Sequence, residues 1–317
     1  MLLKPFLAKC SDRNVLPKVH PGSGSPDDWF ANDILIPNGL FGISFDFFVN
    51  WSSYPNSLSP IIWIKRVLSP DYKYRNIIKN LNNVIIDEFG ADYLLRLIAF
   101  ASKFKLAVQL IIFRDDFDWS DKANTVIVVD VNSDAQGSLH FSHNEITITQ
   151  FKLIIQANSG GPVSIGHKGL IFGTSNLECA LSQTDSLYPG DIDLLLLNDA
   201  NEPVAIIEYK KHTLSSSIND QNLSKYYPKP DGRKYDRLAI LRDFLNANNI
   251  SLPVIIIYYP IEEGFKQGRM ELVKGPVGKL SSFAASNFKL PANNLSEQKL
   301  PVILKTLKAI HYYSRSH

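Results

Sequence analysis

The most informative segment of the sequence is Gly190-Asp-Ile-Asp-Leu-Leu-Leu-Leu-Asn-Asp-Ala-Asn-Glu-Pro-Val-Ala-Ile-Ile-Glu-Tyr-Lys210. Two apolar runs flank a polar turn at Asn198–Pro203, which is typical of a β-hairpin. Because side chains alternate across a strand, Asp191 and Asp193 share one face of the first strand, opposite Ile192, Leu194 and Leu196. By the same rule Glu208 and Lys210 share one face of the second strand. The hairpin therefore brings Asp193 close to Glu208 at one end of an apolar sheet.

Two carboxylates and an amine are costly at such a position unless something compensates their charge. A divalent cation held by Asp193 and Glu208, with Lys210 beside it to pair with developing negative charge, explains the set. Carboxylate oxygens suit Mg²⁺ or Mn²⁺. The residues alone leave a second interpretation open, in which Glu208 and Lys210 form a salt bridge at a strand end and Asp193 is a turn acid.

The segments around this hairpin predict the order helix, hairpin, helix, strand. Apolar residues recur at helical spacing after residue 233, and the hairpin is followed by another short apolar run. The expected helices are Asn176–Ser182, Arg233–Ala247 and Leu300–Tyr313, and the expected strands are Asp191–Leu197, Val204–Lys210 and Leu252–Tyr259.

The spacing of the acidic residues resembles that of the PD-(D/E)XK nuclease superfamily, which includes restriction endonucleases, junction resolvases and recombination exonucleases. Asp193 is followed 15 residues later by Glu208-Tyr-Lys210, and Asp191 matches the form of the first motif with a second acid two residues earlier. The proline of that motif does not directly precede Asp193, since Pro189 lies four residues upstream. The resemblance covers residues 165–260 and implies a core of helix, three strands, helix and strand, in agreement with the predicted order.

By this resemblance Asp193, Glu208 and the main-chain carbonyl of Tyr209 would hold Mg²⁺, with Mn²⁺ as a substitute. Lys210 would orient the attacking water and stabilise the charge on the phosphorane. The resemblance also implies DNA as the substrate. Many such enzymes cut two strands with two subunits, which leaves a homodimer open.

Glu178 is a further candidate catalytic acid, because many members of the superfamily place an acid on the helix before the motif. A structural interpretation has equal standing. Ser175-Asn-Leu-Glu178 has capping-box spacing, in which Glu178 would close the start of a helix.

A break in the middle of the chain, Asn158-Ser-Gly-Gly-Pro162, predicts two domains, residues 1–160 and 161–317. The expected fold class is α/β, a restriction-endonuclease-like mixed sheet flanked by helices, preceded by a separate mixed α+β domain with a recognition or assembly role. In that N-terminal half we expect a helix at Ala91–Lys105 and strands at Ala107–Phe113, Thr125–Val131 and Glu145–Ile155.

The composition excludes several classes. With 45% hydrophobic and 20% charged residues the chain is an ordinary globular protein, and no segment reads as a secretory signal or a membrane span, so a cytoplasmic protein without a membrane partner is expected. Cys10 and Cys179 are too few for a disulfide framework or a structural zinc site, so no redox role is expected. Because the net charge is only +2, nucleic-acid binding would have to be local, as in the basic stretch Lys225–Arg242, unless that stretch is a solvated helix face.

Three functions follow from these patterns. The first is a Mg²⁺-dependent endonuclease that hydrolyses DNA. The second is a catalytically inactive protein of nuclease fold that binds nucleic acid or supports assembly. The third is a partner-binding protein whose N-terminal half acts and in which the motif is a coincidence; it predicts no metal site at Asp193 and Glu208.

Overall fold

The computed structural model describes residues 2–71, 74–163, 169–186, 188–246, 251–292 and 295–316. The chain forms two compact units. Unit 1 comprises Met1–Pro17 and Phe45–Asp191, and unit 2 comprises Lys18–Ser44 and Ile192–His317. The chain thus passes between the units three times, whereas the sequence predicted one boundary after residue 160.

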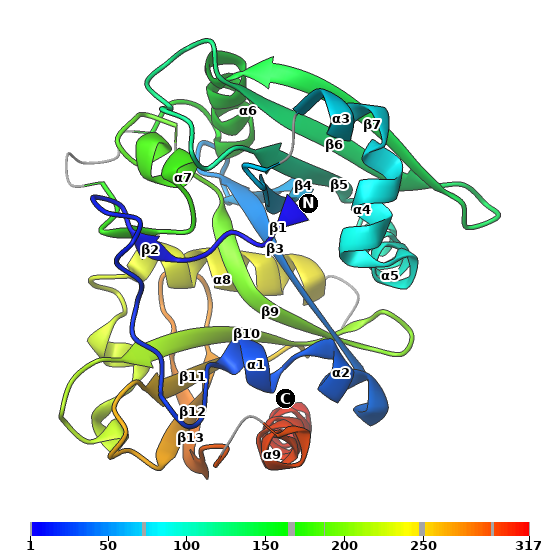
Figure 1. Ribbon diagram of the computed structural model, residues 1–317. Helices are drawn as coiled ribbons and strands as arrows, with labels where there is room; N and C mark the ends of the chain where they lie inside the picture. The colour runs from blue at the N-terminus through cyan, green and yellow to red at the C-terminus, as the bar shows by residue number, and fades with distance from the viewer. Residues whose placement is uncertain are drawn as a thin grey trace. The chain divides into compact units, whose positions relative to one another are not determined.

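Unit 2 is built on a mixed sheet in which β9, β10, β11, β12 and β13 lie side by side in this order (Figure 1). The strands β10 and β11 are parallel, and the other neighbouring pairs are antiparallel. A helical crossover is therefore required between β10 and β11. The strands are β9 (Gly190–Asn198), β10 (Pro203–His212), β11 (Val254–Pro260), β12 (Gln267–Lys274) and β13 (Ser281–Lys289).

The two faces of this sheet carry different helices. On one face, apolar side chains of β9 to β13 form a core with α1 (Pro26–Trp29), α2 (Asn32–Leu35) and α9 (Ser296–Arg315). On the other face lies the crossover, which includes α8 (Gly232–Leu245). The crossover also contains the short turns η2 (Ile218–Asp220) and η3 (Leu223–Lys225), and η1 (Ile36–Asn38) follows α2.

In unit 1 the strands lie side by side in the order β3, β4, β5, β6 and β7, with β1 paired to β4 (Figure 1). Here β4 and β5 are parallel, and the other neighbours in that order are antiparallel. A separate pair is formed by β2 (Ala8–Lys9) and β8 (Phe172–Gly173). The strands of the sheet are β1 (Leu2–Leu3), β3 (Leu40–Asn50), β4 (Ser57–Leu68), β5 (Ala107–Phe113), β6 (Thr125–Ser133) and β7 (Leu139–Thr147).

The helices of unit 1 also divide between two faces. The crossover from β4 to β5 consists of α3 (Tyr74–Lys79), α4 (Leu81–Phe89) and α5 (Ala91–Lys103). On the opposite face, α6 (Ile148–Ser159) and α7 (Asn176–Leu181) pack on a core that includes Trp63.

The mixed α/β character and the principal predicted elements are confirmed, including the helix after Ala91 and the strand Ala107–Phe113. The predicted strand Glu145–Ile155 is wrong beyond Thr147, where α6 begins. The Thr147 side chain accepts a hydrogen bond from Gln150 N, and Gln150 caps Thr147 in return. This reciprocal cap satisfies backbone donors of the first helical turn and so favours a helix over the strand.

Cys10 and Cys179 form a disulfide within unit 1, a single bridge and not a disulfide framework. Cys10 directly follows β2, and Cys179 lies on α7, which follows β8 in the sequence. The pairing of β2 with β8, extended by a hydrogen bond from Cys10 N to Ile171 O, therefore brings the segments that carry the two cysteines together. Disulfides persist mainly in oxidising compartments, so the bridge does not favour the cytoplasmic prediction, which stays a prediction. Within the described residues, no helix has the length and apolar character needed to span a bilayer.

Candidate active site

The hairpin of β9 and β10 has the register and facing that its sequence predicts. Ile207 pairs with Leu194, so the antiparallel register continues to Glu208 opposite Asp193. Leu194 and Ile207 both enter the core shared with α9, which places Asp193 and Glu208 on the other face. Asp193 Oδ2 accepts a hydrogen bond of 2.6 Å from Tyr209 N. The hairpin therefore brings together the acids that the motif names.

Glu208 is the most deeply buried of the predicted site residues, with only 1% of its surface exposed. Its Oε1 lies 2.6 Å from Nζ of Lys234, which is on α8. A buried carboxylate in a sheet of isoleucines needs such a positive partner. The contact also identifies Lys234 as a member of the site, and it comes from the basic stretch that the sequence had left undecided between nucleic-acid binding and a solvated helix face.

Lys210, at the end of β10, points toward the same crossover. Its ammonium forms an ion pair with Asp231, just before α8, and lies 4.2 Å from the centre of the Tyr226 ring. The Tyr226 hydroxyl donates to Gln221 Oε1 at 2.6 Å. An acid, an aromatic ring and a buried amide therefore fix the position of the amine.

A second layer supports this arrangement. Glu271 on β12 is fully buried, and its Oε2 accepts hydrogen bonds from Leu223 N at 2.8 Å and from the Tyr258 hydroxyl at 2.7 Å. Tyr258 stacks on Tyr226, with ring centres 6.1 Å apart. Glu271 thereby anchors the turn that carries the ring under Lys210. No motif in the sequence indicated this residue.

Tyr235 of α8 contributes a hydroxyl beside the acids. Burial raises its pKa, the charge on Glu208 raises it further, and Lys234 opposes that effect, so the phenol stays neutral at physiological pH. Within the part of the chain that the structure describes, the buried Tyr235 hydroxyl has no hydrogen-bond partner. A buried hydroxyl in this position has a donor to offer to a water or a phosphate oxygen.

The donor set fits a hard cation such as Mg²⁺. Among the described residues, no three or more histidine, cysteine, aspartate or glutamate side chains are grouped to hold a metal. Mg²⁺, however, commonly takes only one or two carboxylates from the protein and completes its shell with water and substrate phosphate. Asp193, Glu208 and the carbonyl of Tyr209 can supply such a partial shell.

Glu178 belongs to unit 1 and acts at the start of α7. Its backbone N donates to the Ser175 hydroxyl at 3.1 Å, and its Oε2 accepts from both N and Oγ1 of Thr174 at 2.6 Å. These bonds account for Glu178 as a residue that caps its helix. Its carboxylate bonds Thr174, one residue before the N-cap Ser175 whose backbone N a strict capping box would use. A catalytic role for Glu178 stays a prediction.

Unit 1 contains a buried ion pair that the sequence did not indicate. Asp46 of β3 and Lys65 of β4 lie 3.1 Å apart, and Lys65 Nζ is 4.8 Å from the centre of the Tyr188 ring. The pKa of Asp46 is raised to about 7, chiefly because the carboxyl group is buried. The charge of Lys65 opposes this rise, and the charges of Asp191 and Glu178 add to it.

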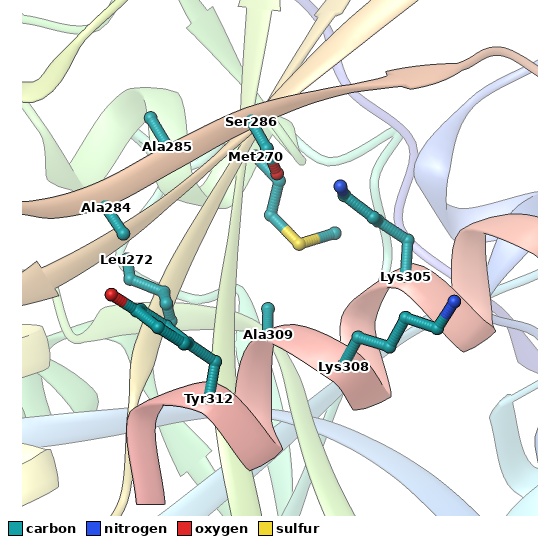
Figure 2. A pocket seen from close by; sticks show the side chains of 9 residues that line it. All are labelled: Met270, Leu272, Ala284, Ala285, Ser286, Lys305, Lys308, Ala309 and Tyr312. Carbon is teal, nitrogen blue, oxygen red and sulfur yellow. The ribbon is translucent and has the colours of Figure 1, made fainter. Parts of the chain in front are cut away.

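Unit 2 also has a cavity of about 250 Å³ on the sheet face that packs against α9. Figure 2 shows its lining, in which Lys305 and Lys308 project from α9 beside the side chain of Met270 on β12. The lining contains no carboxylate, and Met270 lies on the face opposite Glu208. This cavity is therefore separate from the candidate site.

The chain matches no protein-family model, and neither the curated proteins nor the solved structures contain a match to it.

Proposed function

We propose that unit 2 is a metal-dependent nuclease domain of the PD-(D/E)XK type that hydrolyses phosphodiester bonds in DNA. The observation that carries the proposal is the convergence of Asp193, Glu208 and Lys210 on one face of a β-hairpin, beside the crossover that follows it. A salt bridge at a strand end explains neither the burial of Glu208 nor the alignment of Asp193 with it.

Each residue has a distinct role in this proposal. Asp193 and Glu208, with the carbonyl of Tyr209, would hold Mg²⁺ or Mn²⁺, and the bound cation would neutralise phosphate charge and favour ionisation of a water. Lys210 would stabilise the negative charge that builds on the phosphate in the transition state. Tyr235 would donate a hydrogen bond to a water or a phosphate oxygen beside Glu208.

A second candidate function is an inactive nuclease fold that binds nucleic acid or supports assembly. It is favoured by one observation, namely that Glu208 and Lys210 are already compensated by Lys234 and Asp231. An internal ion-pair network can satisfy these charges with no cation bound. A homodimer is compatible with either function.

The test is cleavage of supercoiled plasmid, linear duplex and single-stranded DNA in Mg²⁺ and in Mn²⁺. The proposal expects cutting by the intact chain and its loss, by at least about a hundredfold, in Asp193→Asn. Asp199→Asn is a matched control, because it removes the same charge from an exposed position in the turn of the same hairpin.

The outcomes separate the candidate functions. If the intact chain binds DNA and cuts none of these substrates, the inactive fold is the better account. Equal cutting by Asp193→Asn and Asp199→Asn would overturn the assignment of the site.

A further inference from the structure

The two units share one topology. In both, the first two strands form an antiparallel hairpin, a helical crossover leads to a third strand parallel to the second, and two antiparallel strands follow. The same five-strand order with the same directions therefore occurs twice along the chain, which allows the two units to be compared position by position.

The helices repeat as well. In each unit the face opposite the crossover is covered by the helix that follows the fifth strand, α6 in unit 1 and α9 in unit 2. A second covering helix on this face precedes, in the sequence, the first strand of the other unit. The helix α7 precedes β9, the first strand of unit 2, but packs in unit 1. The helices α1 and α2 precede β3, the first strand of unit 1, but pack in unit 2. The two copies have thus exchanged their leading helices.

This exchange explains the boundaries. The first two residues of β9 belong to unit 1, and Leu40–Ser44 of β3 belong to unit 2. Along the sequence, the first copy ends with α6 at Ser159, and Gly160 ends that helix in the left-handed conformation (φ 87°). The predicted boundary after residue 160 therefore falls between the copies, even though the compact units do not follow it.

The duplication allows the two copies to be aligned by strand, register and face. In unit 2 the pair Asp193 and Glu208 faces the crossover. In unit 1 the register of Asp46 with Trp63 continues to Phe45 opposite Ile64. Phe45 contacts Phe100 of the crossover helix α5, with ring centres 6.0 Å apart, so this pair also faces its crossover.

The basic residue is retained in the same alignment. Lys210 stands two residues after Glu208, and Arg66 stands two residues after Ile64. Arg66 pairs at 2.8 Å with Glu88 on its crossover and lies 4.2 Å from the centre of the Phe89 ring. The contacts of Lys210 with Asp231 and Tyr226 have the same form.

We infer that the chain is two copies of one fold of which only the second carries a cutting centre, so that each chain cuts one DNA strand and a double-strand break requires two chains. The first copy keeps the basic residue, but Phe45 and Ile64, both at most 5% exposed, occupy the positions of the metal-binding acids. Apolar side chains offer no oxygen to a hard cation. This inference rests on the proposed nuclease function.

The experiment combines Mn²⁺ binding, followed by electron paramagnetic resonance, with a time course on supercoiled plasmid. The intact chain is expected to bind Mn²⁺ and to accumulate open circles before linear DNA. The rate of linearisation should rise with protein concentration more steeply than the rate of nicking. The double variant Asp193→Asn/Glu208→Gln should lose both the binding and the nicking, with circular dichroism confirming that it is folded.

Three results would count against different claims. An intact chain that binds no Mn²⁺ and cuts nothing overturns the proposed function. Nicking that survives in the double variant overturns both the single-centre inference and the assignment of the site to Asp193 and Glu208. Linear DNA formed directly at a rate proportional to protein concentration, with nicking lost in the double variant, overturns only the single-centre inference.

Discussion

The crossover-facing strand surfaces of the two units differ in chemistry, although the two units share one strand order and the same strand directions. In unit 2 this surface carries Asp193 and Glu208; Lys234 of the crossover pairs with Glu208, and Tyr209 N of β10 donates to Asp193. In unit 1 the aligned positions are Phe45 and Ile64, and they are core. The comparison shows that two aligned positions of a hairpin carry acids in one unit and core side chains in the other; under the proposed function, these two positions decide which unit cuts. Substitutions in unit 1 should therefore change stability and leave cutting intact, whereas substitutions of Asp193, Glu208 or Lys210 in unit 2 should change cutting.

The largest effect in unit 1 is expected for Trp63→Ala. Trp63 is fully buried, stacks on Phe151 with ring centres 5.1 Å apart and donates to Gln109 Oε1 at 2.9 Å. Removing the ring should lower the free energy of unfolding by about 3–5 kcal/mol, measured by urea denaturation. Below the unfolding transition, cleavage should stay within a few-fold of the intact chain. Loss of cutting in a folded Trp63→Phe variant would break the comparison.

A smaller effect concerns pH and the buried pair of Asp46 and Lys65. Because the pKa of Asp46 is about 7 in the folded protein against an ordinary 3.8, the folded state retains a proton between these values that the unfolded state has lost. Stability should therefore fall as the pH rises from 4 to 7, by up to about 4 kcal/mol. Asp46→Asn should flatten this slope in melting experiments.

The control for that slope is Asp116→Asn. The hydrogen bond from Arg114 lowers the pKa of Asp116, so above about pH 5 this group is ionised in both the folded and the unfolded state. Its removal should therefore leave the slope between about pH 5 and 7 unchanged. A slope that survives in Asp46→Asn would show that another group carries the proton.

The smallest effect is expected for Thr147→Ala at the start of α6. The lost cap should cost about 1 kcal/mol, measured by denaturation, with cleavage unchanged. Thr147→Ser keeps the capping oxygen and should retain most of the stability. Equal losses in the two variants would mean that the methyl group, and not the cap, stabilises this junction.

Sequence patterns predicted the β9–β10 hairpin of unit 2 well and the rest of the fold less completely. The runs Leu194–Leu197 and Val204–Ile207 are continuously apolar and flank a polar turn, so the hairpin could be predicted directly, and the alternation of side chains along a strand then gave the facing of Asp193 and Glu208. In contrast, β13 carries small side chains such as Ala284 and Ala285 and is largely half-exposed, which leaves little apolar pattern to read. The exchange of leading helices could not be predicted, because it depends on which sheet a short helix covers and not on the helix itself.

Within the candidate site, the residues missed were those supplied from a distance. Lys234 and Asp231 belong to a stretch whose charge pattern is also that of an ordinary solvated helix. Glu271 is a single acid in an apolar strand, and only the tertiary structure shows that it receives bonds from Leu223 and Tyr258. Pairing across the crossover, unlike alternation along a strand, leaves no periodic trace in the sequence.

The most direct test of the central claim is plasmid cleavage by Lys210→Ala beside Lys211→Ala in Mg²⁺. Both variants lose one lysine from β10, but Lys211 points away from the acids, and its Nζ donates to Lys18 O at 2.9 Å. The account predicts that Lys210→Ala loses at least about a hundredfold in cutting rate while Lys211→Ala stays within a few-fold of the intact chain. Equal rates for two folded variants would contradict it.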